Sequence, residues 1–125
     1  MKYLKRYGSF EQPEGTGKDS YWGKEIDGEL QIITLTDILN YLDEVKEMDP
    51  NEIKHLLIDV ERDSNRIESA DLNYPVILTS IRGEIKSILD GQHRVLKAIK
   101  NGKMVKVRIL DLDSAPEKIK SILLF

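Results

Sequence analysis

Five consecutive residues, Asp90-Gly91-Gln92-His93-Arg94, bring together groups that can bind an anion or move a proton. Gly91 allows a ligand to approach the backbone closely, and Arg94 offers a two-pronged guanidinium for phosphate or carboxylate. His93 can donate hydrogen bonds or titrate near neutral pH. We therefore predict a phosphate-binding turn formed by Gly91, Gln92, His93 and Arg94, with Asp90 and His93 as the candidate catalytic acid or base.

The same five residues, hereafter the 90–94 turn, also allow a purely structural interpretation. Asp90 could cap a helix, and Gly91 could serve only to form the turn. His93 and Arg94 could be a first-turn pair that packs on the edge of a sheet. The sequence leaves the binding and the structural interpretation open.

The 90–94 turn lies between a predicted strand and a predicted helix. Residues 85–89 have the pattern of a strand, and residues 92–100 carry apolar side chains at helical spacing before the helix stop Asn101-Gly102. Where a strand ends and a helix begins, free backbone N–H groups and the positive end of the helix dipole face the same crevice. Anions collect at such places.

The flanking segments complete a compact C-terminal half. Residues 75–79 predict a buried strand that forms a hairpin with residues 85–89 through Arg82-Gly83-Glu84. Residues 104–110 alternate apolar and basic side chains, which predicts a strand with a basic outer face. Ser114-Ala115-Pro116-Glu117 is a capping signature for a terminal helix.

The N-terminal part carries weaker signals. Residues 1–28 hold five of the eight glycines, which predicts an irregular arm that is ordered only where Tyr21 and Trp22 dock. We expect a single domain over residues 29–125.

Within this domain, residues 29–33 predict a strand, and residues 35–45 predict a helix behind a threonine cap. Asp49-Pro50-Asn51-Glu52 predicts the start of a second helix, whose apolar stripe extends to Val60. Residues 62–73 read as a polar connection.

Composition limits the classes of function. The chain has 125 residues, no cysteine and only two histidines, His55 and His93. Cysteine chemistry is therefore excluded, and a multi-histidine metal site is not expected. No apolar run reaches 18 residues and no apolar segment follows the basic N-terminus, so we expect a cytoplasmic protein without a membrane partner.

Charge is unevenly distributed along the chain. Between Arg82 and Arg108, eight basic residues stand against two acidic ones, although the whole chain has a net charge of -3. A local positive potential suits an anion site, but the basic run could equally be a solvated surface. That run consists of Lys97, Lys100, Lys103 and Lys106. The acidic pI of about 5.4 argues against nonspecific DNA binding.

Residues 72–112, which include the 90–94 turn in its strand-turn-helix-strand setting, resemble the core of the ParB/sulfiredoxin superfamily. The resemblance implies an α+β fold, in which helices pack on a small mixed sheet, and a pocket for nucleotide phosphate. Gly91, His93 and Arg94 match the sulfiredoxin motif, but Gln92 replaces its catalytic cysteine, which excludes sulfiredoxin chemistry.

The resemblance further implies ATP or CTP, with Mg²⁺, as the cofactor to expect. Where sulfiredoxins contact ATP with a lysine, this chain has Glu52, and His55 and Asp59 replace hydroxyl residues. Since the chain ends at Phe125, we expect no helix-turn-helix domain and no sequence-specific DNA binding.

Three functions follow as hypotheses. The first is a domain that binds a nucleotide or another phosphate-bearing ligand at the 90–94 turn, as a phosphotransferase, a phosphohydrolase or a binding protein. The second is a non-catalytic module that keeps the fold and captures a protein partner. The third and weakest is a ParB-like nuclease, because such an enzyme needs clustered carboxylates beside a basic groove. Fold analogy alone does not decide between them.

Overall fold

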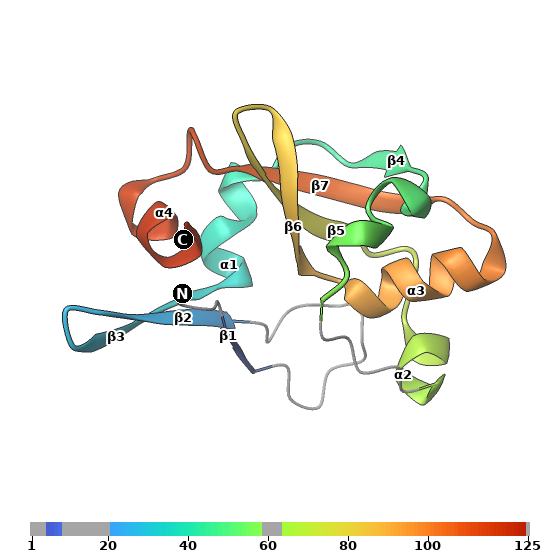
Figure 1. The fold of residues 1–125 in the computed structure, drawn as a ribbon, viewed down its shortest axis with the longest axis horizontal. Helices are drawn as coiled ribbons and strands as arrows, with labels where there is room; N and C mark the ends of the chain where they lie inside the picture. The colour runs from blue at the N-terminus through green and yellow to red at the C-terminus, as the bar shows by residue number, and fades with distance from the viewer. Residues whose placement is uncertain (1–4, 9–20, 59–63, 125) are drawn as a thin grey trace.

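The structure, a computed structural model, describes residues 5–8, 21–58 and 64–124, and its strands form two sheets (Figure 1). The first sheet is antiparallel, with the order β1 (Lys5–Gly8), β2 (Tyr21–Ile26), β3 (Glu29–Thr34). The second has the order β4 (Lys46–Met48), β7 (Val105–Asp111), β5 (Val76–Ile81), β6 (Glu84–Asp90). Its β5–β7 pair is parallel and the others are antiparallel, so the fold is α+β with a mixed sheet.

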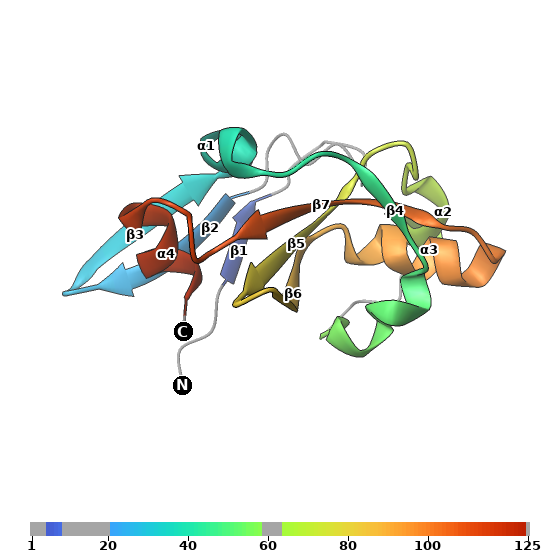
Figure 2. The same cartoon turned by 90° about the horizontal axis from the view of Figure 1, so that it is seen from above.

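Four α-helices accompany the sheets in the described part of the chain. They are α1 (Leu35–Ile38), α2 (Ser64–Ser69), α3 (Gln92–Asn101) and α4 (Glu117–Leu123). Two views at right angles place the first sheet with α1 and α4 at one end of the molecule and α2 and α3 at the other (Figures 1 and 2). The second sheet connects the two ends.

The expected elements of the C-terminal half are confirmed. The β5–β6 hairpin turns at Arg82 and Gly83, with φ of 53° and 77°, the conformation that tight hairpins favour. Helix α3 ends at Gly102 as expected, and α4 follows β7. The predicted capping signature of α4 is wrong, since Pro116 is the N-cap and the Ser114 hydroxyl donates to Asp111 instead.

The irregular arm predicted for residues 1–28 is wrong where the structure describes it. Strand β2 pairs with β3 along its whole length, and the Trp22 side chain is 1% exposed. Trp22 is thus buried as expected, but it is part of a strand in a regular sheet and not of an irregular arm. A domain boundary at residue 28 would cut the turn of the β2–β3 hairpin.

The two long helices predicted between residues 35 and 60 are also wrong. The Thr34 cap is present, but α1 ends after one turn and a 3-10 turn follows at Leu39–Tyr41. The chain then becomes extended, because the free edge of β7 pairs with Leu42 and with β4. These pairings satisfy backbone groups that a helix would leave open on β7.

The second predicted helix is replaced by 3-10 turns at Pro50–Glu52 and Lys54–Leu56, although the Asp49 cap is present. Val60 lies outside the described residues. Where a polar connection was predicted, Ser64–Ser69 form α2.

Two apolar clusters lie on the two faces of the second sheet. One joins Ile77 and Leu110 to Trp22, Ile33 and the buried face of α4. The other joins β5 and β7 to α3 through Val76, Leu78, Val107, Val95 and Ala98. The first sheet and α3 are therefore anchored to opposite faces of the same strands.

Candidate functional site

The 90–94 turn is positioned by an irregularity in the β5–β6 pairing. Ile77 pairs with Asp90 but Leu78 pairs with Ile88, so Leu89 is the extra residue of a β-bulge. A bulge redirects side chains at the end of a strand. Leu89 packs in the cluster of Ile77, and Asp90 borders a hollow with Ile77.

Asp90 and Arg94 face each other across the turn. Arg94 Nη2 donates to Asp90 Oδ2 at 2.9 Å, and the two side chains are 2% and 1% exposed. Arg94 Nη1 donates to the carbonyl oxygen of Pro75, at the entrance to β5. Within the protein, Arg94 thus ties the start of α3 to two strands of the sheet.

This arrangement bears on the roles predicted for Asp90 and Arg94. The terminal nitrogens of Arg94 donate to acceptors of the protein, so its two-pronged end is occupied within the protein. The Asp90 carboxylate is held by Arg94, and the N-cap residue of α3 is Gly91. In this structure the two side chains are thus bound to each other within the protein.

One buried donor near the turn has no acceptor. Among the described residues, Arg94 Nε is the buried side-chain polar atom that lacks a hydrogen-bond partner. An unsatisfied buried donor costs about 1–3 kcal/mol. It lies beside Gly91, where a Cβ would come within 3.3 Å of Nε and 3.1 Å of Cζ. The absence of a side chain at Gly91 is what leaves room for the guanidinium.

Replacing Gly91 with alanine tests this packing. The new Cβ would also lie 3.2 Å from a Val76 methyl group, and φ at this position is +100°. Gly28→Ala is the matched control, because Gly28 also has a positive φ but no atom within 4 Å of an added Cβ. In urea unfolding, we expect Gly91→Ala to lose about 1–3 kcal/mol more than the control. Equal losses of unfolding free energy in the two variants would mean that Arg94 moves away from the new methyl group without an energetic cost.

The remaining residues of the turn have separate roles. The Gln92 amide oxygen accepts the backbone N–H of Ile58 at 3.1 Å, so this side chain holds the segment before residue 59. His93 is 7% exposed and lies among the buried residues of α3. The side chains of the turn are thus engaged or buried within the protein, and the feature of the turn that favours an anion is the positive end of the α3 dipole.

A small hollow of about 150 Å³ lies beside the turn, and we call it the Tyr74 hollow. In the β5–β7 register Ile77 pairs with Arg108, so Arg108 and Asp90 flank Ile77 on neighbouring strands. Arg108 is also fixed, because its Nε donates to the carbonyl of Asp43 at 2.8 Å. The lining residues are Leu35, Leu39, Tyr74, Pro75, Ile77, Asp90, Arg94 and Arg108.

Sequence reasoning did not identify Arg108 or Tyr74 as site residues. Arg108 was predicted only as part of a basic outer strand face. The missing information is the parallel register of β5 and β7, which joins residues about 30 positions apart and has no local signature in the sequence.

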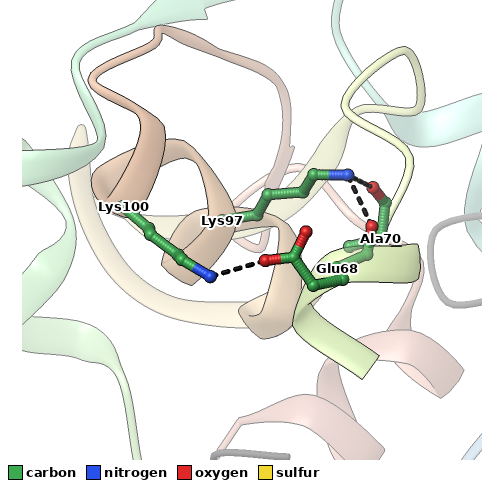
Figure 3. Close-up of polar contacts among 4 residues, drawn as sticks. All are labelled: Glu68, Ala70, Lys97 and Lys100. Carbon is green, nitrogen blue, oxygen red and sulfur yellow. Dashed lines mark hydrogen bonds and ion pairs between the residues drawn. The ribbon is translucent and has the colours of Figure 1, made fainter. Parts of the chain in front are cut away.

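Two lysines of the basic run have partners within the protein. Lys97 Nζ donates to the carbonyls of Glu68 and Ala70 at 2.7 and 2.8 Å, and Lys100 Nζ lies 2.5 Å from the Glu68 carboxylate (Figure 3). The hydrogen bond from Lys100 and its charge lower the pKa of Glu68. Two of the four lysines therefore fasten α2 to α3, which the solvated-surface interpretation did not include.

The residues that the structure describes contain neither a metal-binding cluster nor a membrane-spanning helix. No group of three or more His, Asp or Glu side chains there could hold a metal ion. No helix in that part of the chain is long and apolar enough to cross a membrane.

Comparison of the chain with protein-family models, with curated proteins and with solved structures gives no match.

Proposed function

We propose that the chain is a ParB/sulfiredoxin-like domain that binds a nucleotide or another phosphate-bearing ligand at the 90–94 turn. The observation that carries the proposal is the buried Arg94 Nε without an acceptor, placed against Gly91 at the start of a ten-residue helix. If the packing around Arg94 opens on binding, a phosphate oxygen would supply an acceptor to this cationic donor, and such hydrogen bonds are among the strong ones. The strand-turn-helix-strand order of β6, α3 and β7 supports the fold assignment.

Electrostatics supports an anion rather than a neutral ligand. Asp90 and Arg94 compensate each other in their ion pair, whereas Arg108 adds a further positive charge to the Tyr74 hollow. The helix dipole adds a positive partial charge at the turn. If a polyphosphate binds at the 90–94 turn, its own oxygens would supply most of the ligands of an accompanying Mg²⁺, as is common for this ion.

The geometry supports binding better than phosphate transfer or hydrolysis. A catalytic base must reach the group from which it takes the proton. Asp90, one of the two acid–base candidates, is 1% exposed and paired with Arg94. For Asp90 to act as a base, its ion pair with Arg94 would have to open when the ligand binds. Catalytic activity should therefore be tested only after ligand affinity has been measured.

The test is thermal stabilisation of the purified protein by ATP, ADP, CTP, GTP and inorganic phosphate, with and without Mg²⁺. At one hundred times its dissociation constant, a ligand adds about 2.7 kcal/mol to stability, which raises Tm by several degrees. We expect such a rise with at least one nucleotide.

Arg108→Gln removes the positive charge of the hollow and should reduce that rise, measured against its own ligand-free Tm. Lys106→Gln is the matched control, since Lys106 is on the same strand but does not line the hollow. Equal rises in both variants would exclude the hollow from binding. No rise with any of the five ligands would refute the proposed function.

A second candidate, a protein-interaction module, is favoured by one observation. Strand β3 is an edge of the first sheet, and its Leu30 and Ile32 side chains are 52% and 41% exposed. Exposed apolar edge strands tend to pair with other chains. The absence of stabilisation by every phosphate ligand would turn attention to this edge.

A further inference from the structure

The side chains that line the Tyr74 hollow differ sharply in exposure. Asp90, Arg94 and Ile77 are almost fully buried at 2%, 2% and 4%. Tyr74 and Leu39, by contrast, are 39% and 42% exposed. A few charged groups inside an apolar border are typical of sites that recognise a small molecule with both polar and apolar parts.

The hollow is too small for a whole nucleotide. Pockets that enclose a complete drug-sized ligand have volumes of about 300–1,000 Å³, whereas this hollow has about 150 Å³. It therefore suits one part of a ligand whose other part lies outside it. The adjacent 90–94 turn is where the proposed phosphates would lie, and Asp90 and Arg94 belong to both places.

The backbone at Tyr74 and at the next residue is fixed by hydrogen bonds. Its backbone N–H donates to the carbonyl of Asp71 at 3.1 Å. The carbonyl of the next residue, Pro75, accepts from Arg94. The aromatic side chain is thus attached to a backbone that is already fixed, which lowers the entropy cost of binding a ligand against it.

We propose that the Tyr74 hollow receives the base of a nucleotide whose phosphates lie at the 90–94 turn. This inference rests on the proposed function. Tyr74 offers an aromatic surface on which a base can stack, and the planar guanidinium of Arg108 offers a second stacking surface. The remaining wall, formed by Leu35, Leu39 and Pro75, is apolar and removes water from the ring.

A base held in the Tyr74 hollow would make the protein prefer nucleotides to bare phosphate chains. If the base is held, a nucleoside triphosphate binds more tightly than tripolyphosphate, which has the same phosphate chain and no base. Because stacking accepts the face of any base, the preference should be for nucleotides as a class.

The experiment measures the affinities of ATP, CTP, tripolyphosphate and adenosine by titration calorimetry with the full chain and Mg²⁺. In Tyr74→Ala, we expect nucleotide affinity to fall about tenfold, the loss of one stacking contact, while tripolyphosphate affinity is unchanged. Tyr41→Ala is the matched control: this tyrosine is 47% exposed but does not line the hollow. It should change neither affinity.

The possible failures can be told apart. Equal affinities for nucleotides and tripolyphosphate, or an equal loss of both in Tyr74→Ala, would overturn the inference and leave the phosphate site intact. Binding of adenosine without tripolyphosphate would support the hollow as a base site and overturn the phosphate proposal. If none of the four compounds binds, both proposals are wrong.

Discussion

Replacing Asp90 with alanine is expected to lower the free energy of unfolding by about 3–5 kcal/mol, because it leaves the guanidinium of Arg94 buried without its counter-charge. The two side chains are 1% and 2% exposed, and their nitrogen and oxygen are 2.9 Å apart. Urea unfolding followed by the fluorescence of the single tryptophan, Trp22, measures the loss.

Two further variants make this prediction specific. Lys86→Met removes one partner of the exposed pair with Glu84, and we expect no measurable change in the unfolding midpoint. Replacing both members of the buried pair, as Asp90→Leu with Arg94→Met, should recover most of the stability, since no buried charge remains. A loss below about 1 kcal/mol in Asp90→Ala would show that the pair is open to water in solution.

The ion pair of Asp90 and Arg94 marks the limit of what the sequence predicts about the 90–94 turn. Its position and its glycine are local features, and they were predicted correctly. An aspartate four residues before an arginine at the start of a helix also has the spacing of an ion pair. The sequence could not decide whether Arg94 faces a ligand or Asp90, because that depends on the hydrogen bond from Arg94 to Pro75 and on the bulge at Leu89, which form only in the folded chain.

The C-terminal half was predictable because its signals are short in range. A glycine at the β5–β6 turn and another after α3 determine where these elements end. The N-terminal half depends on pairings between distant segments. Residues 42–48 follow the edge of β7, about 60 positions later, and this pairing overrides their helical periodicity.

The same distinction explains the missed β2 strand. Tyr21–Ile26 contain a glycine and two charged residues among six, a weak strand pattern. Their pairing with β3 buries Trp22 against Ile33, Ile122 and their neighbours, and burial of this ring compensates for the weak local preference. The first sheet is thus held by its contact with the rest of the molecule more than by its own sequence.

This contact leads to the second large effect, which concerns Trp22 itself. Trp22→Ala should lower the free energy of unfolding by about 3–5 kcal/mol, the usual loss for a buried tryptophan, measured by circular dichroism in urea. Leu30→Ala, on the neighbouring strand of the same hairpin, is the control: its side chain is 52% exposed, and we expect a change within about 0.5 kcal/mol. Similar small losses in both variants would mean that the hairpin does not belong to the core, and that a domain beginning at residue 29 is the better description. A large loss in Trp22→Ala alone would make β2 part of the domain whose second sheet carries the 90–94 turn, because the apolar cluster of Trp22 includes Ile77 and Leu89, the neighbours of Asp90.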